Sequence, residues 1–186
     1  MKLLLIRHSR TKFEPETPNE QWVLSEVGVD KAEEFARRPE LAEIEIIYTS
    51  MQLKALATGL KIAEQLRIPM RADHGLTELT SITNGFIPNY NEAVAELYAG
   101  EVERINDGET LTEGLARFDE AIERIVSSHA DLGRIGIVAH CNVLSLYASQ
   151  YEQRTAHELH STMGMPDLAI LDWESKEFDL TFGQAA

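Results

Sequence analysis

The chain has 186 residues, of which 44% are hydrophobic and 26% are charged, so it is long enough to bury one sizeable core. Its formal net charge of -14 opposes binding to nucleic acid and to anionic membranes. The single cysteine, Cys141, excludes an intramolecular disulfide, and the apolar run at residues 3–6 is too short for a membrane span. We expect one cytoplasmic domain that binds any anionic ligand in a local positive pocket.

Apolar runs bounded by polar residues predict strands, and apolar residues at helical spacing predict helices between them. In chain order these are a strand at 3–6, a helix from its cap Ser25 to about Arg38, a strand at 44–48, helices at 53–66, 92–98 and 111–125, and strands at 135–139, 168–171 and, at an edge, 178–182. This alternation predicts a three-layer α/β/α fold with a mostly parallel central sheet. In such folds ligands bind beyond the carboxyl ends of the strands.

Two predicted strands end in a histidine, His8 after the first strand and His140 after the strand at 135–139. If these strands are parallel neighbours, the two imidazoles lie close together. The second predicted strand runs into a helix whose first turn carries Lys54, and a helix N-terminus is a usual setting for an oxyanion. Either histidine alone is more often a structural residue, but the set predicts a pocket for phosphate or sulfate.

Six short motifs occur in a fixed order that covers nearly the whole chain. They are Arg7-His8-Ser9-Arg10-Thr11, Leu24-Ser25-Glu26-Val27-Gly28, Tyr48-Thr49-Ser50 with Lys54, Ala55 and Thr58, Leu76-Thr77-Glu78, Gly108-Glu109-Thr110 with Arg117, and Val138-Ala139-His140. The sequence thereby resembles the histidine phosphatase superfamily, branch 1, which is the phosphoglycerate mutase-like branch. The resemblance implies a phosphoglycerate mutase-like fold.

The resemblance also implies roles for the residues that match the motifs of the family. His8 matches the histidine that takes the phosphoryl group, and Arg7 matches the phosphate-binding arginine beside it. Lys54 falls where the family usually has a second phosphate-binding arginine, and His140 matches the histidine that stabilises the transferring group. These residue types suit a loose, anionic transition state that needs alignment and positive charge.

A carboxylic acid is implied as the proton donor to the leaving alkoxide and then as the base on the attacking water. Glu78 falls in the segment that supplies this group in the family, and Glu109 is the reserve candidate. Thr11 is expected to bind phosphate, because it lies in the loop that normally lines the substrate side of the pocket.

Four residues on the expected substrate side depart from the pattern of the family. Ser9 replaces a glycine, Glu14 replaces an asparagine, and Cys141 with Asn142 replaces two glycines. Together with Lys54, which cannot make the bidentate fork of an arginine, they predict a changed substrate shape or slower turnover.

A lid or insertion is expected at about residues 79–107, and specificity is expected to lie there and in the loop at 14–22. Aromatic residues of these regions could contact an apolar or aromatic part of a substrate, but packing against the domain explains them equally well; they are Phe13, Trp22, Phe86 and Tyr90. A lid implies a bounded pocket and favours a small ligand.

We therefore predict a phosphomonoester hydrolase of the histidine acid type that acts through a phosphohistidine on a small phosphorylated metabolite, without metal or cofactor. Alternatives are a catalytically weakened phosphate-binding or regulatory module, a phosphoglycerate mutase and a phosphoprotein phosphatase. The mutase is disfavoured because this chain is short and acidic. A homodimer is compatible with the sequence, and neither nucleic acid nor a membrane is an expected partner.

Two further patterns in the sequence are not expected to form sites of their own. The pair His140-Cys141 is similar to the nucleophile motif of cysteine phosphatases, but position 147, where those enzymes have an arginine, is Tyr147. His157 and His160 are one helical turn apart, yet no third ligand at a suitable spacing joins them, so they are expected on the surface.

Overall fold

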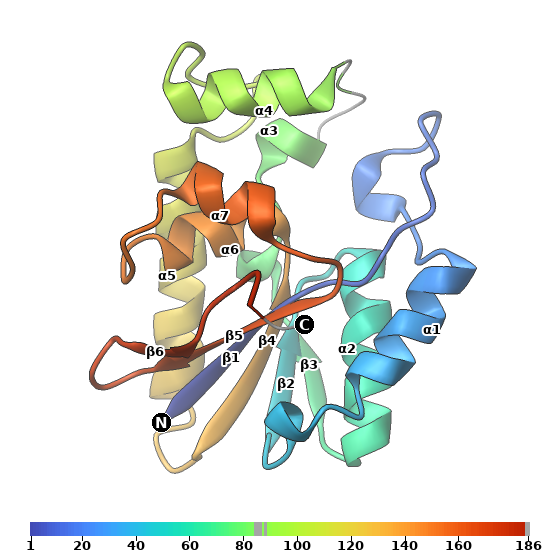
Figure 1. Ribbon diagram of the computed structural model, residues 1–186, viewed down its shortest axis with the longest axis vertical. Coiled ribbons are helices and arrows are strands. Elements are labelled where there is room, and N and C mark those ends of the chain that lie inside the picture. The colour runs from blue at the N-terminus through green and yellow to red at the C-terminus, as the bar shows by residue number, and fades with distance from the viewer. Residues whose placement is uncertain (84–86, 88, 185–186) are drawn as a thin grey trace.

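The computed structural model describes residues 1–83, 87 and 89–184, and its centre is a sheet of six strands in the order β3-β2-β4-β1-β5-β6 (Figure 1). The strand pairs β1·β4, β2·β4 and β2·β3 are parallel, whereas β5 runs antiparallel to β1 and β6 antiparallel to β5. The strands are β1 (Lys2–Arg7), β2 (Ile46–Thr49), β3 (Met70–Ala72), β4 (Arg134–Ala139), β5 (Asp167–Asp172) and β6 (Phe178–Leu180).

Helices cover both faces of the sheet, with α1 and α2 on one side and α5, α6 and α7 on the other (Figure 1). Helix α4 lies above the sheet at the end where the parallel strands finish. The helices are α1 (Glu26–Phe35), α2 (Leu53–Leu66), α3 (Thr80–Thr83), α4 (Tyr90–Ala99), α5 (Leu111–Ser127), α6 (Cys141–Ala148) and α7 (Ala156–Thr162), with 3-10 turns η1 (Asn19–Gln21), η2 (Pro39–Leu41) and η3 (His74–Leu76). The predicted three-layer α/β/α fold is confirmed.

The alternation of side chains along a strand produces two separate cores. Leu3 and Leu5 of β1 belong to the core shared with α5 and α6, and Leu4 and Ile6 belong to the core shared with α1 and α2. All four side chains are fully buried. The continuous apolar run at the start of the sequence is therefore typical of a strand that is covered on both faces.

Polar caps set the beginnings of the helices. The Ser25 hydroxyl accepts the Gly28 amide and starts α1, as expected from the sequence. Thr110 begins α5 with a capping box, in which its hydroxyl accepts the Glu113 amide and the Glu113 carboxylate accepts the Thr110 amide. Helix α1 ends at Phe35, which is earlier than the sequence predicts.

Several boundaries differ from those predicted. Strand β2 starts at Ile46, because the chain still turns at residues 42 and 43 and Glu43 has a positive φ of 68°. The edge strand β3 was not expected, since its three residues are exposed or half-buried and show no alternation. Helix α4 lies in the expected lid region, and Phe86 falls outside the described residues. Within the described part of the chain, no helix is long and apolar enough to cross a membrane.

Candidate active site

The register of the sheet brings the two histidines together. Arg7 of β1 pairs with Ala139 of β4, so His8 and His140 each follow the last paired residue of neighbouring parallel strands. The His8 amide donates to the Ala139 carbonyl, and the ring centroids of the two histidines are 5.1 Å apart. Both side chains are buried. The sequence prediction that these imidazoles converge is confirmed by this geometry.

The tautomer of His8 follows from its hydrogen bond. Its Nδ1 lies 2.7 Å from the carbonyl oxygen of Ser9, and a carbonyl can only accept, so Nδ1 carries the proton. Burial, with the charges of Lys54 and Arg7 acting in the same direction, lowers the pKa of His8 to about 3. At neutral pH the ring is uncharged, and Nε2 presents a free lone pair.

Ser50, the residue after β2, orients His140. The Ser50 Oγ lies 2.7 Å from His140 Nε2 and also accepts the Gln52 amide at 3.2 Å. Among the described residues this hydroxyl contacts no other acceptor for its own hydrogen, so we assign that hydrogen to His140 Nε2 and the proton of the imidazole to Nδ1. Within residues 1–83, 87 and 89–184, His140 Nδ1 has no hydrogen-bond partner. It is a buried donor beside His8, and sequence reasoning gave Ser50 no such role.

Arg7 and Lys54 supply the positive charge of the site. One guanidinium nitrogen of Arg7 donates to the carbonyls of Met163 and Gly164, at 2.6 and 3.2 Å, which holds the side chain against the loop after α7. Lys54, in the first turn of α2, is only 3% exposed. Burial lowers the pKa of Lys54 to about 8, although Glu78 and Glu20 act in the opposite direction.

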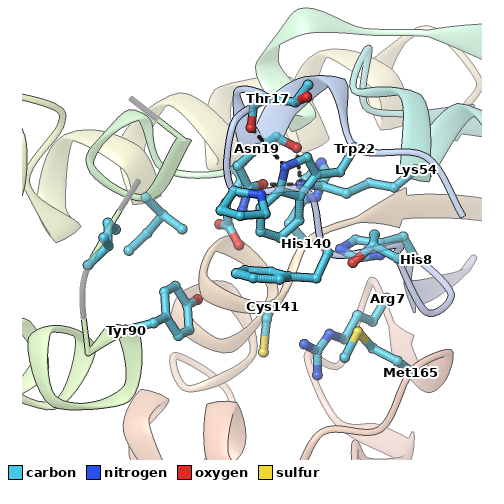
Figure 2. A pocket seen from close by; sticks show the side chains of 16 residues that line it. Arg7, His8, Thr17, Asn19, Trp22, Lys54, Tyr90, His140, Cys141 and Met165 are labelled. Carbon is cyan, nitrogen blue, oxygen red and sulfur yellow. Dashed lines mark hydrogen bonds between the residues drawn. The ribbon is translucent and has the colours of Figure 1, made fainter. Parts of the chain in front are cut away.

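The ammonium of Lys54 contacts the loop that follows β1. It donates to the backbone carbonyl of Asn19 at 2.9 Å and also to the side-chain amide oxygen of Asn19. Asn19 lies on η1 and lines the pocket together with Trp22 (Figure 2). An ammonium has three protons, so this contact still leaves one for a ligand. Sequence reasoning missed Asn19, because no motif marks it.

Glu78 lies buried at the N-terminus of α6, where four N–H groups surround its carboxylate. The amides of Leu79 and Val143 donate to one oxygen, at 3.0 and 3.2 Å, and the amide and side chain of Asn142 donate to the other, at 3.1 and 3.0 Å. The carboxylate faces the same cavity as the two histidines. A helix N-terminus stabilises a negative charge in this position.

Only some of the other expected site residues line the cavity. Thr11 and Cys141 line the cavity, and burial raises the pKa of the Cys141 thiol to about 12, which keeps it protonated. The Ser9 hydroxyl donates to the Gly28 carbonyl at 2.7 Å and is directed away from the pocket lining. Glu14 is paired with Lys12 at 2.6 Å and does not line the pocket.

Glu109, the reserve candidate for proton transfer, is engaged elsewhere. Burial alone would raise the pKa of Glu109, but hydrogen bonds from Arg117 and Thr80 outweigh it and lower the pKa. Arg117 holds this carboxylate at 2.7 and 2.8 Å and also donates to the carbonyls of Gly75 and Thr77. The ion pair therefore fixes the backbone that leads into Glu78, and Glu109 does not line the cavity.

The cavity has a volume of about 300 Å³ and a polar floor beneath apolar walls. Figure 2 shows His8, His140, Arg7 and Lys54 at one end, with Trp22 and Tyr90 on opposite sides. Apolar and aromatic side chains form much of the remaining lining, namely Phe13, Pro15, Trp22, Ile82, Ile87, Tyr90 and Met165. Among the described residues that line it, the only cationic side chains of lysine or arginine are Arg7 and Lys54.

The remaining histidine pair was expected on the surface. His157 is exposed, but His160 is half-buried beneath α4, with its ring centroid 5.8 Å from that of Tyr98. Burial lowers the pKa of His160 to about 4, with Arg7 as the next cause. Across the described ranges of the chain, no group of three or more His, Cys, Asp or Glu side chains is placed to hold a metal ion.

Two imidazoles, a buried lysine and a half-buried arginine surround a small cavity on this α/β/α fold, an arrangement that suits the binding of a phosphoryl group. The comparison with known families agrees. The chain belongs to the histidine phosphatase superfamily (branch 1), whose family model matches residues 3–183. The resemblance inferred from the six motifs is confirmed.

Solved structures share the fold over the whole chain. Bacillus stearothermophilus YhfR is 23% identical, with a TM-score of 0.78, and the match covers 100% of this chain and 98% of that one. A mycobacterial glucosyl-3-phosphoglycerate phosphatase is 20% identical, with a TM-score of 0.78 and coverage of 100% and 99%.

A phosphoserine phosphatase mutant from Entamoeba histolytica, in complex with phosphoserine, is 18% identical, with a TM-score of 0.75 and coverage of 98% and 96%. At these identities the likeness demonstrates the common fold. No curated protein sequence matches the chain significantly.

Proposed function

We propose that this protein is a phosphomonoester hydrolase that acts through a phosphohistidine on a small phosphate ester with a largely apolar alcohol. The observation that carries the proposal is His8, which is neutral and has Nε2 free beside two cations and a buried N–H donor. Phosphatase activity agrees with the family to which the chain belongs. The roles of the individual residues and the nature of the alcohol go beyond that membership.

In the first half-reaction, His8 Nε2 attacks the phosphorus atom and the bond from phosphorus to the ester oxygen breaks. Arg7, Lys54 and the Nδ1–H of His140 stabilise the charge on the three phosphoryl oxygens. Glu78 gives its proton to the departing oxygen. Four N–H groups hold the carboxyl group of Glu78 in place beside the cavity for this transfer.

In the second half-reaction, a water molecule attacks the phosphohistidine and the bond from phosphorus to Nε2 breaks. Glu78 accepts a proton from this water, and His8 returns to its neutral form with the proton still on Nδ1. Inorganic phosphate then leaves. The charged groups named here neutralise the phosphoryl oxygens, so we expect turnover to continue in the presence of a chelator.

The walls of the cavity support an apolar alcohol. The Trp22 ring is fixed because its Nε1–H donates to the carbonyls of Glu14 and Thr17, each at 2.9 Å. Phe13 packs edge-on against it and remains 65% exposed at the mouth of the pocket. A substrate with a second anionic group would find no lysine or arginine on the described walls away from the phosphate end. This favours a phosphatase over a mutase that holds a bisphosphate.

Labelling of the protein tests the reaction. Incubation with a ³²P-labelled aryl phosphate and chelator, followed by rapid quenching, should give an acid-labile, alkali-stable label in wild type and none in His8→Ala. His74→Ala is the matched control, because His74 is exposed on η3 outside the cavity. Turnover in His8→Ala at the wild-type rate would refute the mechanism. Phosphate binding without label or turnover in wild type would instead favour a regulatory module.

A panel of esters tests the substrate class. We expect kcat/KM to be at least tenfold higher for naphthyl phosphate than for phosphoserine or phosphoglycerate. Phe13→Ala should reduce this preference, while Val27→Ala, an exposed apolar residue of α1, should leave it unchanged. Equal kcat/KM for apolar and charged esters would contradict an apolar alcohol, and activity restricted to phosphopeptides would favour a phosphoprotein phosphatase.

A further inference from the structure

A chain of hydrogen bonds connects Glu78 to helix α4 through Asn142. The side-chain amide nitrogen of Asn142 lies 3.0 Å from Glu78 Oε2 and 3.4 Å from the Tyr90 hydroxyl, and the amide oxygen lies 3.3 Å from the Tyr98 hydroxyl. Asn142 is fully buried. The two tyrosines are near opposite ends of α4, so one buried amide holds this helix to the site.

The orientation of the Asn142 amide is determined by its neighbours. Three of the four groups around the Glu78 carboxylate are backbone N–H groups, which can only donate, so the carboxylate is an acceptor. The NH₂ group of Asn142 must then face Glu78, and its oxygen faces Tyr98, whose hydroxyl donates to it. The second N–H of the amide points to the oxygen of Tyr90.

This arrangement decides where the hydroxyl hydrogen of Tyr90 goes. Because the Tyr90 oxygen accepts from Asn142, its own hydrogen is directed to another acceptor, and the described residues provide none. Tyr90 lines the cavity, and Figure 2 shows its hydroxyl pointing into the pocket. Burial raises the pKa of Tyr90, with the Glu78 charge acting in the same direction, so the hydroxyl keeps its hydrogen at neutral pH.

We propose that the Tyr90 hydroxyl, oriented by Asn142, donates a hydrogen bond to the ester oxygen of the bound substrate. This inference rests on the proposed function. The same amide group contacts the Tyr90 oxygen and Glu78 Oε2, which places the two groups side by side on the leaving-group side of the cavity. Glu78 supplies the proton to the departing oxygen, and Tyr90 stabilises the negative charge on that oxygen before the proton arrives.

Asn142 acts here as a positioning residue. It replaces one of the two glycines that the family usually has after the second histidine, and a glycine could make neither side-chain contact. The asparagine at this position therefore adds a hydrogen-bond donor to the pocket, because it orients the hydroxyl of Tyr90. The substrates that gain from it are esters whose leaving oxygen is strongly basic, such as alkyl phosphates.

Two esters with different leaving groups test the proposal. Benzyl phosphate releases a basic alkoxide, whereas p-nitrophenyl phosphate releases an anion that disperses its own charge over the ring. We expect Tyr90→Phe to lower kcat/KM by about tenfold or more for benzyl phosphate, and by less than about threefold for p-nitrophenyl phosphate. A structural role of the hydroxyl would reduce both values equally.

The coupling to Asn142 is tested with a second variant. Asn142→Ala should show the same dependence on the leaving group, and adding Tyr90→Phe to it should cost less than about threefold further, because the hydroxyl is already without its orienting partner. Tyr151→Phe is the matched control, since Tyr151 packs against Tyr147 outside the cavity. We expect it to match wild type with both esters.

Two results would overturn the inference: an unchanged kcat/KM of Tyr90→Phe with benzyl phosphate, or an equal loss with both esters. Full additivity of Tyr90→Phe and Asn142→Ala would remove the positioning role of Asn142. Failure of the proposed function looks different, because wild type would then release phosphate from neither ester. That outcome would overturn the proposed function and this inference together.

Discussion

The protonation of Lys54 should set the alkaline limit of activity. Burial lowers the pKa of this ammonium to about 8, and the phosphate dianion needs its charge. About nine-tenths of the free enzyme carries this charge at pH 7 and about one-tenth at pH 9, so kcat/KM should fall about tenfold over that interval. Bound substrate raises the pKa of Lys54 again, because an opposite charge favours the protonated form. The profile of kcat should therefore extend to higher pH than that of kcat/KM.

Three other titratable side chains of the pocket have pKa values that are shifted away from this interval. The pKa of His8 is lowered to about 3, that of Cys141 is raised to about 12, and that of Tyr90 is raised above its ordinary value. The substrate itself is a dianion above pH 7, since the second pKa of a phosphate monoester is about 6. An alkaline limb near pH 8 is thus assigned to one side chain.

A comparison of two variants makes this assignment testable. Lys54→Arg should remove the limb, because a guanidinium stays charged to beyond pH 12, whatever its effect on the plateau value. Lys61→Arg is the matched control on the same helix, where Lys61 pairs with Glu33 on the surface, and it should keep the limb. The assay is the initial rate of aryl phosphate hydrolysis at low substrate concentration from pH 6 to pH 10. A limb that persists in Lys54→Arg, or a flat wild-type profile, would refute the reasoning.

Three further substitutions probe the supports of the site. Arg117→Met leaves the partly buried Glu109 carboxylate without its partner and should lower the free energy of unfolding by about 3 kcal/mol in urea titrations. Gly28→Ala would place a Cβ 1.9 Å from a backbone oxygen at the base of the loop after β1, and should cost about 2 kcal/mol by the same measurement. Ser50→Ala removes the hydroxyl that contacts His140 and should lower kcat about tenfold, with KM within about twofold, in steady-state assays. A variant that keeps the wild-type free energy of unfolding, or the wild-type kcat in the case of Ser50→Ala, would contradict the role given to the contact it changes.

The sequence predicted most of the sheet because its strands are buried on both faces. A run such as Leu3-Leu4-Leu5-Ile6, short and bounded by charged residues, is typical of a buried strand, and the two strand-end histidines follow from the same pattern. Strand β3 escaped prediction because an exposed edge strand of three residues leaves no hydrophobic period. The order of the strands became visible only in the structure, since it depends on contacts between segments that are distant in sequence.

The site was predictable where a motif names a residue and not where tertiary contacts choose one. His8, His140 and Lys54 stand at fixed places in ordered motifs, and they line one cavity. Asn19 has no motif, and its position depends on the fold of the loop that carries it. Glu14 was expected on the substrate side because of its place in the loop after the first strand, but its carboxylate pairs with Lys12 and it does not line the pocket.

The contact between Lys54 and Asn19 has a consequence for engineering. An arginine introduced at position 54 would bring a wider, planar group to a partner that offers two closely spaced oxygens of one residue. The two positions therefore form a unit, and transplanting the usual arginine of the family into this chain calls for a redesigned residue 19 as well. Libraries that vary both positions together should recover combinations that turn over faster than Lys54→Arg alone.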